Sequence, residues 1–316
     1  MDGFREENLS YAPDLVIVGN AVVRENPEAV KLHHMGLNFC SMPQALNRFV
    51  AGGKTTLLVS GTHGKTTTSS ILAWILHEAG LDPSFMIGGI LKNFDSNYRL
   101  GNGPYFVVEG DEYDTAFFDK GPKFLHFRPQ MAVLTSVEFD HADIFHDLDH
   151  VKRTFKGFIT GLAGSSLLLA YDGDKNLAGL IDNANCRVEN YGQNKSSCWR
   201  LGTISVESPW TTFEIIKNNE TFSVFKTKLF GEHNLLNALA VIAIADHLKI
   251  PLQIIAGALE TFDGIKRRQE IRGEKRQITV IDDFAHHPTA VRETIRAVKS
   301  VHSKGRLIAV FEPRTN

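Results

Sequence analysis

The residues best suited to chemistry in this sequence are a lysine and a threonine that follow two glycines. The segment 59–68 reads Val-Ser-Gly-Thr-His-Gly-Lys-Thr-Thr-Thr, with an apolar strand pattern before it and a helical pattern after it. Glycines let backbone N–H groups close on phosphate oxygens, and a helix N-terminus adds positive potential. Lys65 can reach the β- and γ-phosphates, and the Thr66 hydroxyl can ligate Mg²⁺. The sequence therefore predicts an ATP and Mg²⁺ site at Gly61, Thr62, His63, Gly64, Lys65, Thr66 and Thr67.

Acidic residues follow two further strand patterns. Glu109 comes directly after the strand pattern 105–108, and the run 138–143, Glu-Phe-Asp-His-Ala-Asp, follows the pattern 131–137. Ligands of open α/β sheets bind outside the carboxyl ends of the strands, so Glu109 is expected at the same edge as Lys65, as a metal ligand. One imidazole is less typical for Mg²⁺, so the residues leave His141 open between a metal ligand and a packed histidine.

Three weaker motifs occur later in the chain. Residues 231–238, Gly-Glu-His-Asn-Leu-Leu-Asn-Ala, begin a helix, which Asn234 is expected to cap. The run 266–268, Lys-Arg-Arg, is either a solvated basic turn or a phosphate clamp. In the run 282–288, Asp-Asp-Phe-Ala-His-His-Pro, a carboxylate serves either to bind a ribose hydroxyl or to cap the following helix.

Composition narrows the class of protein. The chain has 316 residues, 43% hydrophobic and 22% charged, with a net charge of −2. No global field favours nucleic acid or an anionic membrane surface. The three cysteines show no metal-ligand spacing, the N-terminus has no apolar signal segment, and no apolar run could cross a bilayer. We expect a cytoplasmic, soluble protein.

The elements that must position these groups indicate an α/β fold in three parts. We expect a partial Rossmann-like N-terminal domain at 1–52 and a central P-loop domain at 53–269. The central domain is expected to hold a mostly parallel sheet with a small antiparallel portion. Residues 166–229 are expected to differ in character, with strands at 166–170, 199–206, 212–216 and 221–226, and the last two strands flank an expected hairpin loop at 217–220. A further unit at 270–316 reads as strand 278–281, helix 289–301 and strand 307–310, the start of a Rossmann-like domain. Two parallel strands cannot bury their own faces, and the first unit lacks an opening strand and glycine-rich turn. The chain is therefore expected to be truncated at both ends.

The ordered set of motifs resembles the Mur ligase superfamily, whose members form amide bonds with ATP in peptidoglycan synthesis. The resemblance covers the chain from Asp14 onward. It implies that Glu109 and His141 are metal ligands and that the segment with His233, Asn234 and Asn237 contacts adenine. It also implies that Arg268 contacts phosphate and that Asp283 binds ribose. Its members activate a carboxylate as an acyl phosphate, which an amine then attacks.

Four stretches are more specific within this family. Residues 109–120, 138–145, 282–289 and 311–316 resemble the murein peptide ligase branch, which joins L-alanyl-γ-D-glutamyl-meso-diaminopimelate to UDP-N-acetylmuramate in peptidoglycan recycling. The resemblance implies these two substrates, a bacterial source, no nucleic-acid or membrane partner, and a monomer or weak oligomer. The alternatives are a UDP-N-acetylmuramate–L-alanine ligase, a more distant folylpolyglutamate synthase, or an ATP-binding remnant without turnover.

Overall fold

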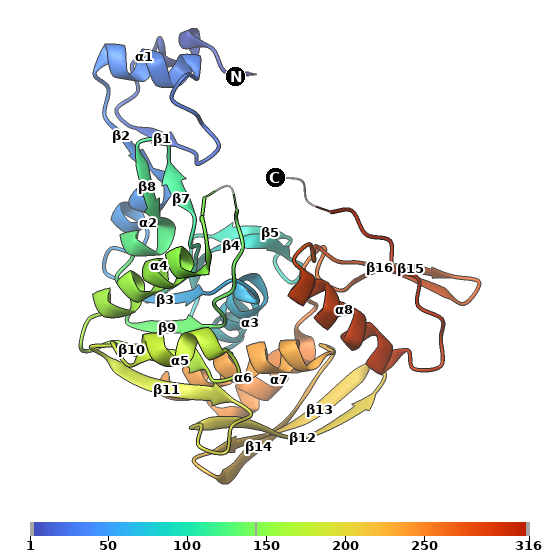
Figure 1. Cartoon of the computed structure of the whole chain (residues 1–316). Coiled ribbons are helices and arrows are strands. Elements are labelled where there is room, and N and C mark those ends of the chain that lie inside the picture. The colour runs from blue at the N-terminus through green and yellow to red at the C-terminus, as the bar shows by residue number, and fades with distance from the viewer. Residues whose placement is uncertain (1–2, 143, 314–316) are drawn as a thin grey trace.

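The computed structural model describes residues 3–142 and 144–313 (Figure 1). Asp143 of the acidic run and residues 314–316 of the last stretch lie outside this part. A ten-stranded sheet forms the centre of the molecule, in the order β14-β13-β12-β11-β10-β9-β3-β6-β4-β5. No helix in the described part is both long and apolar enough to cross a membrane.

Seven neighbouring strands of this sheet, β12 to β4, are parallel, and six of them carry the site. They are β11 (Arg187–Gly192), β10 (Leu167–Tyr171), β9 (Met131–Leu134), β3 (Thr55–Ser60), β6 (Tyr105–Gly110) and β4 (Ser84–Leu91). Side chains that alternate along β3 enter two different cores, because successive residues of a strand point to opposite faces. Leu57 and Val59 pack against helices on one face, and Leu58 packs against helices on the other.

Helices cover both faces, as parallel sheets require. Residues of α3 (Lys65–Glu78), α6 (Glu232–His247) and α7 (Leu252–Thr261) belong to the core with Leu57 and Val59. Residues of α4 (Leu148–Gly161) and α5 (Lys175–Ile181) belong to the core with Leu58. The expected α/β fold with a mostly parallel sheet is confirmed.

The antiparallel portion continues the sheet at one end. It begins at β12 (Trp199–Glu207), which is parallel to β11 and antiparallel to β13 (Trp210–Lys217), and β13 is antiparallel to β14 (Glu220–Thr227). The short β5 (Ser96–Arg99) closes the opposite edge of the sheet. Asn218 and Asn219 connect β13 to β14 with φ values of 51° and 69°. Positive φ at both central residues is what a two-residue hairpin turn needs.

The N-terminal residues form a small separate core. It contains η1 (Glu6–Leu9), β1 (Val16–Val18), α1 (Pro27–Met35) and β2 (Phe39–Ser41), and α2 (Met42–Phe49) leads to β3. A hairpin of the central part, β7 (Asp114–Ala116) and β8 (Asp119–Pro122), reaches this unit and continues into η2 (Lys123–His126). Phe117 joins the N-terminal core, and the rings of Phe118 and Phe39 lie 4.9 Å apart. The aromatic pair of the 109–120 stretch therefore holds the N-terminal unit.

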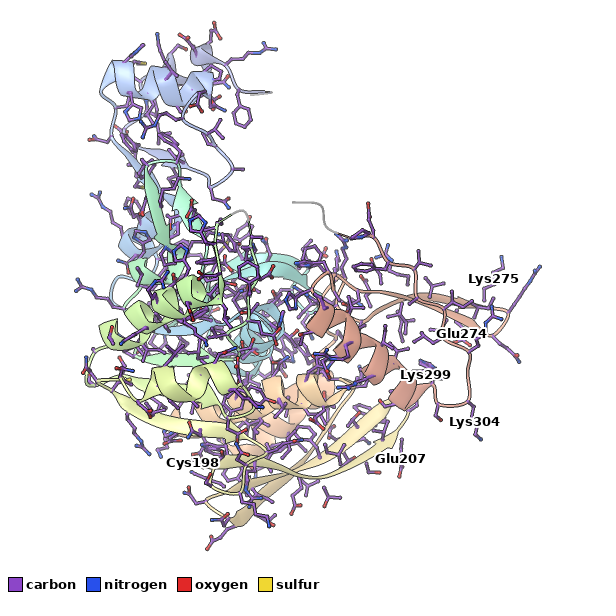
Figure 2. The ribbon with its side chains drawn as sticks, viewed as in Figure 1. Cys198, Glu207, Glu274, Lys275, Lys299 and Lys304 are labelled. Carbon is purple, nitrogen blue, oxygen red and sulfur yellow. The ribbon has the colours of Figure 1, made fainter. Side chains whose placement is uncertain are left out.

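The C-terminal unit differs from the expectation. It contains β15 (Glu270–Lys275), β16 (Ile278–Asp282) and α8 (Pro288–Val301), and the two strands form an antiparallel hairpin. Arg276 and Gln277, with φ values of 51° and 64°, make the tight turn, and Figure 2 shows Glu274 and Lys275 at its outer tip. The strand expected at 307–310 is wrong, since these residues adopt no strand and pair with no described neighbour. An apolar pattern becomes a strand only where another strand lies beside it.

Candidate functional site

The phosphate loop lies between the centre of the sheet and α3. β3 ends at Ser60 and α3 begins at Lys65, with Gly64 as N-cap at φ 80°. A Cβ at position 64 would lie 2.6 Å from the Asn237 side-chain oxygen, and the positive φ would strain a residue with a side chain, so both features favour glycine here. The loop backbone is held by the segment that follows β9: Thr62 N–H donates to Ser136 O at 2.9 Å and His63 N–H to Ser136 Oγ at 3.0 Å.

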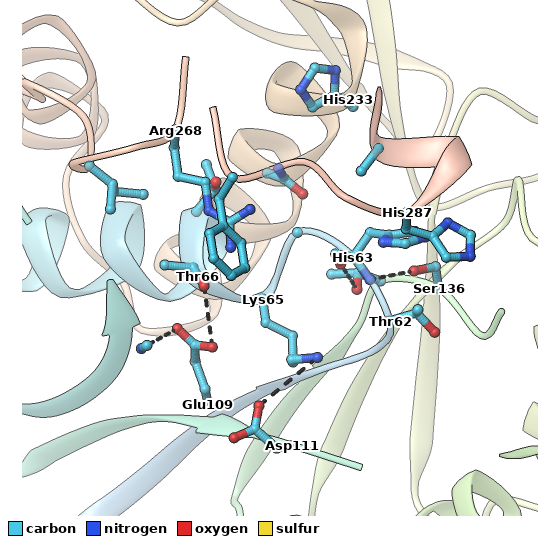
Figure 3. Close-up of a pocket in the computed structure, with 18 of the residues that line it drawn as sticks. Thr62, His63, Lys65, Thr66, Glu109, Asp111, Ser136, His233, Arg268 and His287 are labelled. Carbon is cyan, nitrogen blue, oxygen red and sulfur yellow. Dashed lines mark hydrogen bonds and ion pairs between the residues drawn. The ribbon is translucent and has the colours of Figure 1, made fainter. Parts of the chain in front are cut away.

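Lys65 is buried among acidic groups at the start of α3. Its Nζ donates to Gly61 O at 2.7 Å and to Glu112 Oε2 at 2.9 Å, and lies 4.0 Å from Asp111 Oδ1 (Figure 3). Burial alone would lower the pKa of Lys65, but the charges of Glu112 and Asp111 outweigh it and raise the pKa. The lysine therefore stays charged.

Glu112 was not among the residues predicted for the site. Its side chain is only 2% exposed, and its two oxygens face Lys65 and His141. The sequence places it within the acidic run 109–114, but spacing along an irregular loop does not tell which carboxylate turns inward. Its burial beside a lysine is the feature that distinguishes it.

Thr66 and Glu109 lie together beside the carboxyl ends of β3 and β6, where the sequence predicts a metal site. Thr66 Oγ1 donates to Glu109 Oε2 at 3.3 Å, and Gly88 N–H donates to Glu109 Oε1 at 2.7 Å. Burial and the charge of Asp111 raise the pKa of Glu109 to about 7, against the opposing effects of Gly88 and Lys65. A hydroxyl beside a carboxylate offers the oxygen ligands that Mg²⁺ prefers.

His141 faces the same cavity from the loop after β9. Its φ is 56°, and its Nε2 lies 3.9 Å from Glu112 Oε1. The ring also packs against Tyr113, with 5.0 Å between centroids. The structure therefore brings His141 beside Glu112, on the opposite side of that carboxylate from Lys65. A metal-ligand role for His141 stays a prediction.

The residues predicted to contact adenine lie on the first turns of α6. Asn234, the expected N-cap of this helix, does not cap it. The helix begins at Glu232 with Gly231 as N-cap, so Asn234 lies inside it and the expected cap is wrong. Asn234 Nδ2 instead donates to Phe230 O and to Gln269 Oε1, each at 3.0 Å. His233 Nδ1 is buried and has no hydrogen-bond partner among residues 3–142 and 144–313, and burial lowers the pKa of this imidazole.

Arg268 and Asp283 meet at the junction with the C-terminal unit. Asp283 Oδ2 accepts from Gln269 N–H and Oδ1 from Ala285 N–H, both at 2.8 Å. The capping alternative for this carboxylate is wrong, because His287 is the N-cap of α8. Arg268 lies over the Phe284 ring at 5.1 Å, and its burial lowers its pKa. An arginine stays charged even so.

These groups open onto one cavity of about 1520 Å³. It lies between the phosphate loop, the edge of the sheet, the start of α6 and the C-terminal unit (Figure 3). Every candidate residue lines it except Gly61, namely Thr62, His63, Gly64, Lys65, Thr66, Thr67, Glu109, His141, His233, Asn234, Asn237, Arg268 and Asp283. Residues missed by sequence reasoning also line it, among them Asp111, Lys123, Gln269 and His287. The arrangement can hold a polyanion at one end and a flat polar group at the other.

Comparison with known proteins agrees with this geometry. The family model for the Mur ligase middle domain matches residues 59–245, and that for the Mur ligase glutamate ligase domain matches 267–316. The chain is 40% identical to the UDP-N-acetylmuramate–L-alanyl-γ-D-glutamyl-meso-2,6-diaminoheptandioate ligase of Haemophilus influenzae, over 98% of this chain and 68% of that protein. It is 34% identical to a UDP-N-acetylmuramate–L-alanine ligase of Clostridium botulinum, over 99% of this chain and 66% of that protein.

A solved structure supports the same grouping. The murein peptide ligase of Psychrobacter arcticus superimposes with a TM-score of 0.81 at 34% identity, over 100% of this chain and 69% of that one. The agreement extends through the N-terminal and C-terminal units and is therefore not confined to the phosphate loop. The chain belongs to the Mur ligase family.

Proposed function

We propose that this Mur ligase joins L-alanyl-γ-D-glutamyl-meso-diaminopimelate to UDP-N-acetylmuramate in an ATP-dependent reaction. One observation above all supports an ATP-dependent reaction: Lys65, Thr66 and Glu109 line a single cavity beside a glycine-rich loop. The choice of substrates rests on the greater similarity to the ligase that acts on this tripeptide, at 40% identity, than to the L-alanine ligase, at 34%.

The residues present fit a nucleotide. Gly61 and Gly64 carry no side chains, so the loop backbone N–H groups beside them can approach phosphate oxygens. His233 also lines the cavity, and its buried Nδ1 has no partner in the described part of the chain, so it can bond a polar ligand atom. We propose that the first turn of α6 contacts adenine, with Arg268 near the phosphates and Asp283 near the ribose.

Lys65 has the donors that phosphoryl transfer requires. An ammonium group has three N–H donors, and Gly61 O and Glu112 use two of them. The third is available to a phosphate oxygen, while Glu112 keeps the side chain extended across the loop. We propose that Thr66, Glu109 and His141 hold Mg²⁺. ATP would supply the phosphoryl group that activates the muramate carboxylate as an acyl phosphate, and Mg²⁺ would offset the charge on the phosphates.

The roles of the three units are also part of the proposal. We assign UDP-sugar binding to 1–52, ATP binding to 53–269, and a share of peptide binding to the unit that begins at 270. The cytoplasmic location and the monomeric or weakly associated state stay predictions from the sequence.

A coupled phosphate-release assay tests the proposal. The chain is mixed with ATP, Mg²⁺ and UDP-N-acetylmuramate, and then with either the tripeptide or L-alanine. We expect phosphate release with the tripeptide and little with L-alanine. Release only with L-alanine would assign the chain to the alternative ligase. Tight ATP binding without release in either mixture would contradict turnover by this chain.

A further inference from the structure

A group of two histidines and one glutamate lies where three parts of the chain meet. His63 belongs to the phosphate loop, Glu138 to the loop after β9, and His287 to the start of α8. Figure 3 shows His63 and His287 side by side, and their ring centroids are 4.6 Å apart. Among residues 3–142 and 144–313, this is the one group of three histidine, cysteine or acidic side chains whose ligand atoms all lie within 4.8 Å.

The distances within this group suit a tetrahedral ion. His63 Nε2 lies 3.3 Å from Glu138 Oε2, and His287 Nδ1 lies 3.6 Å from the same oxygen. Nitrogen and oxygen ligands about 2.05 Å from a tetrahedral ion are about 3.3 Å from one another. Small rotations of the side chains would therefore place all three atoms around one ion.

We propose that His63, Glu138 and His287 form a binding site for a divalent transition-metal ion, with Zn²⁺ as the preferred ion. Two imidazoles and a carboxylate with a fourth position open are a ligand set typical of Zn²⁺, whereas a site with two imidazoles among three ligands is a poor fit for Mg²⁺, which is bound mainly by oxygen atoms. The side chains are 23%, 32% and 17% exposed, and all three line the cavity. An ion and its water ligand can therefore enter from the solvent.

The hydrogen bonds of His287 leave Nδ1, the ring nitrogen that faces Glu138, without a proton. Its Nε2 lies 3.2 Å from Phe139 O, to which it can only donate, and its Nδ1 accepts from Thr289 N–H at 3.3 Å. A metal-ligating histidine commonly donates its other ring N–H to a carbonyl oxygen in this way. The long bond from Thr289 N–H is what an ion would displace.

Hydrogen bonds orient Glu138 toward the two histidines. Its Oε2 accepts from Thr289 Oγ1 at 2.8 Å and lies 3.3 Å from His63 Nε2, and a bound ion would take the place of the proton between these two atoms. The site is separate from Thr66 and Glu109, and it does not depend on the proposed reaction. A bound ion would fix the C-terminal unit against the phosphate loop.

Cobalt substitution tests the site without an activity measurement. The chain is stripped with a chelator and titrated with Co²⁺, whose tetrahedral complexes absorb visible light far more strongly than octahedral ones. We expect one equivalent of Co²⁺ to give the intense spectrum and Zn²⁺ to abolish it. Failure of the wild-type chain to give this spectrum would overturn the proposal.

Matched variants assign the spectrum to these residues. His287→Asn removes the imidazole but keeps a good N-cap for α8, and Glu138→Gln keeps an acceptor for Thr289. Each should weaken Co²⁺ binding at least about tenfold. His286→Asn, beside the site, and Glu109→Gln, in the proposed Mg²⁺ site, should keep the spectrum. Equal losses in His286→Asn and His287→Asn would also overturn the proposal, and circular dichroism confirms that each variant is folded.

Discussion

The phosphate loop and the C-terminal unit reach the same cavity, but they are held in very different ways. The loop follows a strand at the centre of the sheet, and Val59 and Ser60 have no exposed surface. The C-terminal unit touches the loop region through a few polar contacts, such as Thr289 with Glu138 and His287 with Phe139. Its hairpin leaves Ile271 57% and Ile278 65% exposed.

This difference separates two kinds of functional residue. Groups on the loop are positioned by the core, so their geometry does not depend on how the C-terminal unit is placed. Groups on the C-terminal unit act only when that unit lies against the loop. Substitutions in the loop should therefore alter chemistry and stability, whereas substitutions in the C-terminal unit should alter nucleotide affinity.

Lys65→Ala gives the largest expected effect on the loop side. Turnover should fall at least about 100-fold, since a preorganised charge on the phosphates is lost. The free energy of unfolding should also fall by about 3 kcal/mol, because buried Glu112 loses its partner. Phosphate release and denaturant unfolding measure the two effects.

The double variant Lys65→Ala/Glu112→Gln separates these effects. It should regain most of the stability, because no unpaired carboxylate remains, but none of the turnover. Recovery of turnover in this variant would show that Lys65 acts only through the fold.

Gly61→Ala should have the next largest effect. The glycine has φ 125°, and an added Cβ would meet Thr135 Oγ1 and would lie 2.8 Å from Ser136 N. We expect a loss of about 2–3 kcal/mol in stability and weaker nucleotide binding. Gly53→Ala is the matched control, since it has φ 78° but no atom within 4 Å of its Cβ position. Equal losses in the two variants would show that backbone strain, and not contact with Thr135 and Ser136, causes the loss of stability.

Asp283→Asn tests the C-terminal side of the comparison. The amide cannot accept from Gln269 N–H and Ala285 N–H in the same way, so the junction should loosen. We expect the KM for ATP to rise about tenfold, equivalent to about 1.4 kcal/mol, with a smaller change in kcat. Glu274→Gln, at the exposed tip of the same unit, should leave both constants unchanged. A fall in kcat without a rise in the KM for ATP would contradict the proposal that Asp283 positions the junction for nucleotide binding.

The smallest effect should come from a carboxylate outside both regions. Burial would raise the pKa of Glu189, but hydrogen bonds from His247 and Trp199 outweigh it and lower the pKa. Its contribution to stability is therefore present above the pKa of the unfolded chain and is lost as the pH falls through the folded value. Glu189→Gln should cost about 1 kcal/mol at pH 7 and make stability less dependent on pH below 5. Turnover at pH 7 should not change.

The sequence by itself determined the parts of the molecule that depend on neighbouring residues. The strand, glycines and helix around Lys65 form where the pattern predicts them, and Asn218–Asn219 makes the predicted hairpin loop. Turn geometry and the alternation of apolar residues are local properties, so they can be read along the chain. The α/β class followed from the same patterns.

Only the tertiary structure decided which distant groups meet. Glu112, rather than a neighbouring acid, faces Lys65, and His63, Glu138 and His287 come together from three segments. Residues 307–310 have a strand pattern, but no strand of the described part of the chain lies beside them. Pairing and burial depend on contacts far apart in the chain, and local preferences do not contain that information.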